Sequence, residues 1–591
     1  MKPKYFLFLL LSFYILNSTS SIATVRYVSK SGTSTPPYTS WQTAADSIQK
    51  CINICVDGDT VYVGNGVYIE QIVINKSISL VGLSMDSTII DGRNAIPYRI
   101  VFFSNYGSIE NFTINGAGSA ANVGIGTFNA NIHIKNCKVK NIAYGMTITL
   151  STSIVENCFI TNCSELYIRD ECGEDTCQSI YRNNIIISTM GNTGAYFSFG
   201  GKPTFINNLV IDEASRLRGV DIQYNSGAII KNNLVSGYSG INIRAGVITS
   251  DTAYIENNIS VNSLTAYDAS TGDRTIIRNN IAKDSFRGIQ SSNGTLVPNY
   301  NLFWNLDQLY YGTIIPGDSN TFADPMFIKD TIPIIGGAYD FHLQKYSPAI
   351  DKGDPNILDK DGTRSDIGMY GGPLGETYTY QDLAPLAPRN FSAVLDSEYI
   401  RLKWNKNTEA DTSFYKVYRD TVTGFQIDST KLIASVADTF FVQTIPHKKS
   451  KVVYKITCVD NQGNESLPSV EVVVDLTSVS ADDYPMTISD YILYQNYPNP
   501  FNPSTRIGYQ LKERAYVKLM VYDIKGELIS VLVNKEQNAG YYEVEFSSSS
   551  IQHPVSSIQN LASGIYLYRI EVIGEGNIPV YTEMKKMLMI K

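Results

Sequence analysis

The sequence predicts an all-β chain, in which a right-handed parallel β-helix solenoid is followed by two β-sandwich domains. Asparagine-led dipeptides recur every 21 to 26 residues between Asn111 and Asn280. An apolar residue stands two positions before nearly every dipeptide, and the residue between is mostly charged. A repeat of this length indicates a solenoid whose turns bury their faces against one another. Neighbouring positions of opposite character indicate strands with one face in and one face out.

The columns of the repeat give each position a role. Asparagine tolerates the left-handed backbone that a corner between strands requires, and its amides can stack from turn to turn. The charges alternate in sign along the solenoid, so we expect cross-strand ion pairs between neighbouring turns. The dipeptides begin at Asn111, Asn136, Asn157, Asn183, Asn207, Asn232, Asn257 and Asn279. The apolar column consists of Ile134, Val155, Tyr181, Phe205, Ile230, Ile255 and Ile277. The charged column consists of Lys135, Glu156, Arg182, Lys231, Glu256 and Arg278.

Residues 1–23 read as a secretory signal peptide, with Lys2 and Lys4 before an apolar run too short to cross a bilayer. We expect no transmembrane span in the mature chain. Residues 24–373 then form the β-helix. Trp41–Cys51 has helical spacing and is predicted to cover the open first turn.

Both ends of residues 24–373 resemble known β-helix proteins. Arg26–Ser29 and the run Asp-Gly-Asp-Thr-Val-Tyr-Val-Gly-Asn-Gly-Val-Tyr at 57–68 resemble the start of pectin-lyase-like proteins. Asp324–Phe327, Asp340–Leu343 and Ser347–Gly353 resemble the closing segment of secreted bacterial β-helix proteins. The resemblance implies the fold and leaves the activity open.

Composition and charge limit the kinds of partner that we expect the protein to bind. A net charge of −8 gives no basic patch for phosphates, so we expect no nucleic acid. Among the eight cysteines, Cys172 and Cys177 are placed to close a small acidic loop through a disulfide, and Cys137 and Cys158 are expected on adjacent turns.

No cofactor is required by any motif, and calcium is the one candidate metal. Asp359, Asp361 and Asp366 offer oxygen ligands at the right kind of spacing, although a bidentate glutamate is missing and turn formation is the alternative interpretation.

After a proline-containing linker at 374–387, residues 388–477 alternate as the strands of a β-sandwich. They resemble a fibronectin type III domain, with Trp404 as its buried tryptophan and Tyr454 as its corner tyrosine. Cys458 is expected to be a lone buried thiol. A second linker covers 478–489.

Residues 490–591 open with Tyr-Pro-Asn-Pro-Phe-Asn-Pro-Ser-Thr at 497–505 and close on a basic, apolar strand, Lys585–Lys591. They resemble the C-terminal sorting domain (type A) of the type IX secretion system, apart from a Ser-rich insert at Ser547–Ser557. The resemblance implies the type IX secretion machinery as partner. It also implies that the protein is secreted or held on the outer-membrane surface of a Gram-negative, Bacteroidota-like bacterium, with release and anchoring both open.

A second strand in each turn supplies the candidate site. Its second and fourth positions are mostly apolar, so we expect its third and fifth positions to face outward over four turns. Outward aromatic rings beside arginine, aspartate and amides suit a sugar chain, because rings stack on pyranose faces and polar groups fix hydroxyls. The substrate-binding candidates are Tyr167, Arg169, Phe197, Phe199, Asp221, Gln223, Asn242 and Arg244.

Two functions remain open. One is a non-catalytic, adhesin-like protein that binds an extracellular polysaccharide or surface glycan. The other is a carbohydrate-active enzyme, a polysaccharide lyase with Arg169 or Arg244 as base, or a glycoside hydrolase. A hydrolase needs two carboxylates, and only Asp221 stands in the outward columns. No histidine-based triad is apparent. The sequence therefore favours the binding protein and identifies no catalytic residue.

Overall fold

The protein is described by a computed structural model. The described residues are 23–94, 98–117, 123–172, 177–188, 193–198, 201–212, 218–223, 227–237, 239–244, 252–269, 274–330, 339–396, 399–444, 451–476, 491–496, 499–538, 540–547, 562–574 and 579–590. Residues 1–22 of the predicted signal peptide, Phe199 and all but the first residue of the insert Ser547–Ser557 lie outside these residues. Backbone clustering divides the chain into two compact units, and the β-helix belongs to the first.

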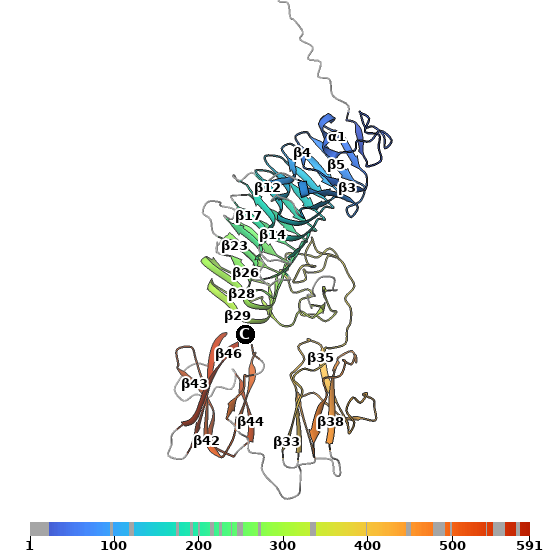
Figure 1. Cartoon of the computed structure of the whole chain (residues 1–591). Coiled ribbons are helices and arrows are strands. Elements are labelled where there is room, and N and C mark those ends of the chain that lie inside the picture. Colours follow the sequence, from blue (N-terminus) through green and yellow to red (C-terminus); the bar gives the residue numbers. More distant parts are fainter. Residues whose placement is uncertain are drawn as a thin grey trace, which may run out of the picture. The chain divides into compact units, whose positions relative to one another are not determined.

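The first unit is a parallel coil, and Figure 1 shows its strands stacked turn upon turn. One face is an all-parallel sheet of eleven strands. It consists of β1 (Val25–Val28), β2 (Thr60–Val63), β5 (Ile78–Gly82), β8 (Gly107–Glu110), β11 (Ile132–Lys135), β13 (Ile154–Glu156), β15 (Ile180–Arg182), β18 (Thr204–Ile206), β21 (Ile229–Lys231), β24 (Ala253–Glu256) and β27 (Thr275–Arg278). We call it the first face. The fold class predicted from the sequence is confirmed.

A nineteen-stranded sheet wraps around the rest of the coil, because its longest strands turn a corner and serve two faces. The second face contains β3 (Gly66–Ile69), β6 (Thr88–Asp91), β9 (Thr113–Asn115), β16 (Ile185–Ser188), β19 (Leu209–Asp212), β22 (Leu234–Ser236), β25 (Ile259–Val261) and β30 (Thr321–Phe322). The third face contains β4 (Ile72–Ile74), β7 (Arg99–Phe103), β10 (Val123–Thr127), β17 (Thr193–Ser198), β20 (Arg218–Gln223), β23 (Ser239–Arg244) and β26 (Thr265–Ala269). Four longer strands run through both faces, namely β12 (Lys138–Thr149), β14 (Phe159–Glu171), β28 (Ile281–Leu296) and β29 (Leu302–Ile314).

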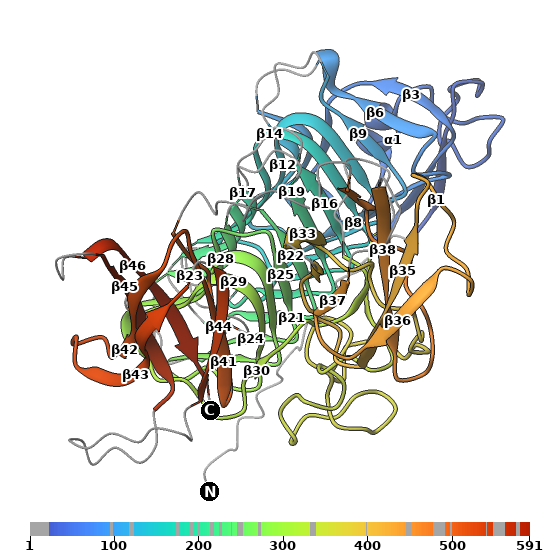
Figure 2. The same cartoon turned by 90° about the horizontal axis from the view of Figure 1, so that it is seen from below.

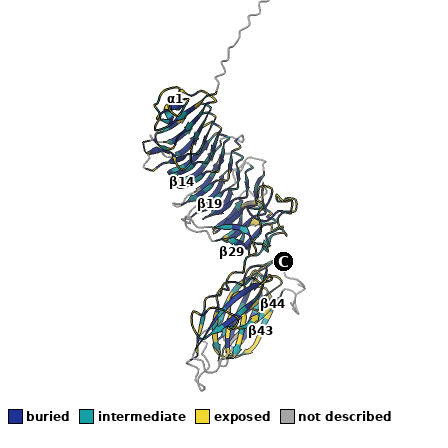
Figure 3. Cartoon of the chain, turned by 90° about the vertical axis from the view of Figure 1, so that its right-hand side faces the viewer, coloured by how far each residue is buried: buried dark blue, intermediate teal, exposed yellow. Residues whose placement is uncertain are grey.

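The apolar column of the repeat fills the interior of the coil. Ile134, Val155, Tyr181 and Phe205 are completely buried in one continuous core. Figure 3 shows the buried residues following the strands along the coil. Burial of this column on every turn is the main source of stability of the solenoid.

The two residues of each asparagine-led dipeptide have different structural roles. The leading asparagines have positive φ, from 49° at Asn136 to 63° at Asn111, so they form the predicted left-handed corners. From Asn184 onward, the residue after the corner is the one that stacks. Its side-chain amide donates to the side-chain oxygen of the next member at 2.9–3.2 Å, through Asn184, Asn208, Asn233, Asn258, Asn280, Asn301 and Asn320. We call this series the asparagine ladder.

The charged column pairs across neighbouring turns of the first face, as predicted. Arg182 lies 2.5 Å from Glu156, and both Lys231 and Arg278 lie within 2.6 Å of Glu256. Because Glu256 is only 3% exposed, these pairs are partly shielded from water and from salt.

A short helix covers the first turn, but the predicted bounds were wrong. α1 spans Ile48–Ile54 rather than Trp41–Cys51. The carboxylate of Glu70 accepts hydrogen bonds from the backbone amides of Ile48 and Gln49, which fixes the start of the helix. Ile48, Cys51 and Ile52 pack into the core, so the helix closes the end of the coil as expected.

The segment after the last turn runs back along the asparagine corners. It contains a small antiparallel sheet, β31 (Phe327–Lys329) and β32 (Asp340–Leu343), followed by turns. The side-chain amide of Asn232 donates to the carbonyl of Met369 at 2.8 Å, and that of Asn257 donates to the carbonyl of Asp366 at 3.0 Å. The corner asparagines therefore also anchor the closing segment.

The rest of the chain folds into antiparallel sheets. The predicted fibronectin-like region pairs β33 (Ser392–Asp396), β34 (Tyr399–Lys403) and β37 (Phe440–Thr444) in one sheet, and β36 (Leu432–Val436), β35 (Thr412–Asp420), β38 (Lys451–Asp460) and β39 (Val472–Asp475) in another. Trp404 is buried against Phe391 and Tyr415, and Tyr454 is completely buried. Cys458 is buried and is not part of a disulfide, as predicted.

The last region also has two sheets around one core, and its strands are visible in Figure 2. They are β40 (Ile492–Leu493), β41 (Ser504–Leu511) and β44 (Gly540–Ser547), and then β43 (Leu528–Gln537), β42 (Ala515–Tyr522), β45 (Gly564–Ile573) and β46 (Pro579–Met589). Among the described residues, no helix is long and apolar enough to cross a membrane.

Candidate functional site

The register of the third face places a column of outward-facing residues along the coil. The backbone pairs run from Thr147 to Arg169, then to Tyr196, Asp221, Asn242, Asp268, Gln290 and Tyr311. We call this column the outer ladder. Its members are polar or aromatic on every one of these turns, whereas the neighbouring columns are mostly apolar and face the core.

Contacts along the outer ladder hold its side chains in place. The Tyr196 hydroxyl contacts the Gln223 side-chain oxygen at 3.0 Å, and the Gln290 amide donates to Asp268 at 3.2 Å. Arg169 forms an ion pair with Glu171, and its guanidinium lies 5.8 Å from the ring centre of Tyr144. The ladder is therefore a series of fixed polar groups.

The middle of the outer ladder is shielded from solvent. Asp221 is 1% exposed and Asn242 is 4% exposed, although both point away from the core of the coil. Arg218 lies 3.6 Å from the Asp221 carboxylate. Gln223 is partly exposed, and Arg244 pairs with it in the backbone register. The side chain of Arg244 lies outside the described residues. The open groove predicted through these turns is therefore interrupted at Asp221 and Asn242.

Two predicted surface aromatics lie in the core instead. Tyr167 is completely buried and Phe197 is 3% exposed. A bulge in β14 adds one residue between the pairs Ile142–Cys163 and Tyr144–Leu166, just before Tyr167. The register of the following strand explains the position of Phe197. On the next turn Phe197 pairs with Asp170 and Ile222, which puts it in an inward column and leaves Tyr196 outward.

The same register brings a carboxyl group into the coil. Asp170 is 5% exposed, and its Oδ2 accepts a hydrogen bond from the Tyr181 hydroxyl at 2.7 Å. Burial raises the pKa of Asp170 to about 7, against the lowering effect of the bond from Tyr181. Phe197 packs edge-on against Tyr181, with ring centres 5.2 Å apart.

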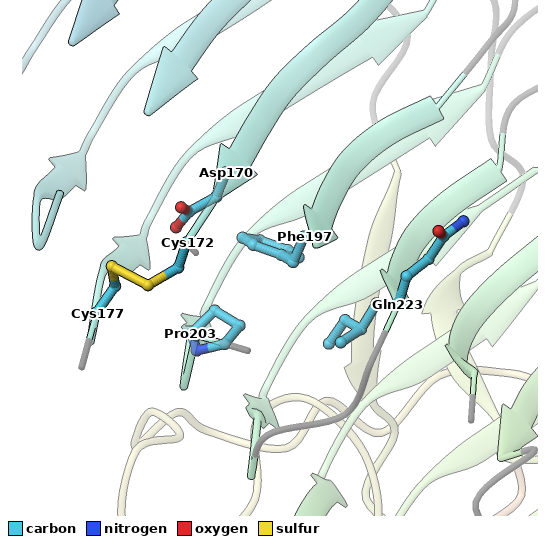
Figure 4. A pocket seen from close by; sticks show the side chains of 8 residues that line it. Asp170, Cys172, Cys177, Phe197, Pro203 and Gln223 are labelled. Carbon is cyan, nitrogen blue, oxygen red and sulfur yellow. A yellow bond between two sulfur atoms is a disulfide. The ribbon is translucent and has the colours of Figure 1, made fainter. Parts of the chain in front are cut away.

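A small pocket opens beside this carboxyl group, and Figure 4 shows its lining. Asp170, Phe197 and Gln223 contribute to it, together with the disulfide between Cys172 and Cys177. The disulfide joins the two cysteines that the sequence singles out. Cys137 and Cys158 are free thiols that follow the corners of adjacent turns.

Two exposed aromatic side chains lie near the end of the third face, on residues that sequence reasoning missed. Phe286 is 42% and Tyr311 48% exposed, and the Arg287 guanidinium stands between them, 5.0 Å and 4.8 Å from their ring centres. The Arg287 Nε donates to Gln308 at 3.0 Å. We call Phe286, Arg287 and Tyr311 the aromatic–arginine patch. Continuing the outward column past Asn242 to Asp268, Gln290 and Tyr311 would have found its tyrosine.

No family model matches the sequence. No curated protein matches it either. Similar solved structures include an Fn3-like protein from Clostridium thermocellum, at 31% identity over 15% of this chain and 91% of that one, with a TM-score of 0.14. They also include pectin methylesterase PemA from Erwinia chrysanthemi (13% identity, 46% and 90% of the two chains, TM-score 0.24) and a pectin methylesterase from Yersinia enterocolitica (16%, 39% and 80%, TM-score 0.22). None of these similarities extends over the whole chain.

The carboxylates of the three acids predicted to bind calcium accept hydrogen bonds from neighbouring turns. Asp359 accepts the backbone amides of Asp366 and Gly372, and Asp361 accepts the amide and hydroxyl of Thr363. Asp366 accepts the Asp351 amide and the Tyr380 hydroxyl. Each carboxylate faces its own donors. Within the described residues, a different trio of acids brings its ligand atoms together.

Proposed function

We propose that the chain is a secreted or cell-surface protein that binds an extracellular polysaccharide or surface glycan on the third face of its β-helix, without cleaving it. The aromatic–arginine patch carries this proposal. Two half-exposed rings with a guanidinium between them offer apolar faces for pyranose rings and a fixed donor for hydroxyl or carboxylate groups.

The outer ladder extends the patch along the coil. Gln290 pairs in the backbone with Tyr311, and Asp268 pairs with Gln290, so polar groups recur at one turn's spacing from the patch. Successive turns are about 4.8 Å apart. A sugar unit spans about one such step, and a chain lying along the coil would meet a new polar group at nearly every unit.

The alternative, a glycoside hydrolase, has one specific observation in its favour. Asp221 and Asp268 stand in the same outward column with Asn242 between them, so they are two turns, or about 10 Å, apart. This is near the carboxyl separation of about 6.5–9.5 Å in inverting enzymes. Against it, Asp221 is buried and lies beside Arg218. Binding without cleavage therefore fits the geometry better.

A screen of the purified protein against plant, algal and bacterial polysaccharides separates the two functions when it records binding and product release together. We expect binding to at least one polysaccharide and no reducing ends or unsaturated products. Product release that Asp221→Asn or Asp268→Asn abolishes would establish the hydrolase and overturn our proposal. Absence of both signals across the panel would also overturn it.

We further propose that residues 490–591 direct the chain through the type IX secretion machinery of a Bacteroidota-like bacterium. The resemblance of this region to type IX sorting domains and its compact two-sheet fold support the proposal. In a type IX-competent host, deletion of residues 490–591 should leave the protein in the periplasm, whereas the full chain should reach the medium or the cell surface. Equal export of both forms would contradict the proposal.

A further inference from the structure

An acidic cluster lies beside the β-helix in a place that the glycan proposal does not involve. The carboxylates of Asp382, Asp411 and Asp460 each offer an oxygen within 4.8 Å of the others. Asp382 follows the closing segment of the coil, Asp411 directly precedes β35, and Asp460 ends β38. The segments 407–413 and 459–465 belong to the same compact unit as the β-helix. Three sequence-distant segments thus meet at one group of acids.

The burial of this cluster is unusual for like charges. Asp411 is 7% exposed and Asp460 2% exposed. Burial raises the pKa of Asp411, and the charges of Asp460, Glu409 and Asp382 raise it further. Carboxylates are rarely buried together unless a cation compensates their charge.

The Asp411 carboxylate has no such compensation from the described part of the chain. No side chain or backbone amide of another described residue hydrogen-bonds to it, and no lysine, arginine or histidine forms an ion pair with Asp411 or Asp460. Among the described residues, the ion pair at the cluster is that of Lys345, whose Nζ lies 4.0 Å from Asp382, the exposed member. A nearly buried carboxylate aimed at two other acids, with no donor from any other described residue, is an observation separate from the clustering itself.

The neighbouring contacts hold the carboxylates in place. Asp460 accepts the backbone amides of Gln462 and Asn464 at 2.9 Å and 2.8 Å through Oδ1. The side-chain amide of Asn464 donates to both Asp460 and Asp382, at 2.9 Å and 3.1 Å. The amide of Asn461 donates to the Asp411 carbonyl at 2.9 Å, which ties the two segments together.

We propose that Asp382, Asp411 and Asp460 bind a calcium ion. Calcium prefers carboxylate and carbonyl oxygens and accepts irregular geometry with six to eight ligands, some of them water. Three carboxylates give the site a net charge of about −3, which calcium offsets better than a monovalent ion does. Magnesium is less suited, because it demands octahedral geometry and gives up its water reluctantly. Bound calcium would join the segments 407–413 and 459–465 to the segment that follows the coil.

The test is calcium titration of the full-length protein, first stripped with EGTA and then followed by calorimetry and thermal unfolding. We expect one calcium ion per chain and an unfolding temperature that rises with calcium but not with equal magnesium. Asp411→Asn and Asp460→Asn should weaken calcium binding about tenfold or more. The matched control is Asp361→Asn, which removes an exposed acid bonded only within its own turn and should bind calcium like the wild type.

Stability of the variants is checked in EGTA. Asp411→Asn should then unfold no more easily than the wild type, because it removes a charge that calcium no longer neutralises. If that variant does not fold, Asp382→Asn, at the exposed member, provides the same comparison. The proposal is overturned if the wild type binds no calcium, if magnesium acts equally, or if the cluster variants bind calcium as tightly as Asp361→Asn.

Discussion

Inside the β-helix, the hydroxyl of Tyr181 donates a hydrogen bond of 2.7 Å to the carboxyl group of Asp170. Both side chains are buried, and Asp170 stands in a column that holds Ile148 and Ile222 on other turns. An acid in an apolar column is costly to ionise. The raised pKa of about 7 gives this pair a measurable effect on stability.

The pH dependence has a definite sign. The pKa of Asp170 is raised from 3.8 to about 7 in the folded state, so the folded protein holds a proton that the unfolded chain has lost. The contribution of Asp170 to stability is therefore full below about pH 4 and falls by about 1.4 kcal/mol per pH unit up to about pH 7. Asp170→Asn should remove this fall and be more stable than the wild type at pH 8. Urea unfolding of both proteins from pH 4 to pH 8 measures it; parallel curves would contradict the assignment.

The asparagine ladder predicts a second effect on stability. Asn233→Ala removes the acceptor of Asn208 and the donor to the carbonyls of Phe205 and Lys231. Because these groups stay buried without partners, we expect a loss of about 2–4 kcal/mol in the free energy of unfolding. The matched control is Asn207→Gly on an adjacent turn, since glycine keeps the positive φ of 52° at that corner. A smaller loss in the ladder variant than in the corner variant would refute the division of roles between the two asparagines.

The cysteines give a direct test of the covalent structure. All eight lie in described parts of the chain; Cys172 and Cys177 form the disulfide, and the other six are buried and are not part of a disulfide. Without reductant, a thiol reagent should react slowly with the native protein and should titrate six thiols after unfolding. Cys172→Ser should raise that number to seven. Four thiols after unfolding of the wild type would mean that a second disulfide exists, for example between Cys137 and Cys158.

Much of the coil could be predicted from the sequence, because each turn repeats the same local requirement. Positive φ at the corners favours asparagine, and the buried column needs an apolar side chain. The site was harder to predict. In β17, Ala195 rather than Tyr196 pairs with Val220, a difference of one residue from the alignment expected from the sequence. A shift of one residue exchanges inward and outward positions, and so Phe197 was expected on the surface. Contacts between sequence-distant segments, such as Asp382 with Asp411, leave no local pattern.

The central claim is glycan binding at the aromatic–arginine patch. Its most direct test is the affinity of the best polysaccharide from the screen for the wild type and for Phe286→Ala/Tyr311→Ala. Loss of two stacking rings should weaken binding at least about tenfold, at about 1 kcal/mol per ring. The control Tyr106→Ala removes a ring that is 60% exposed elsewhere on the coil and should bind like the wild type. Equal affinity of the double variant and the wild type would contradict the account.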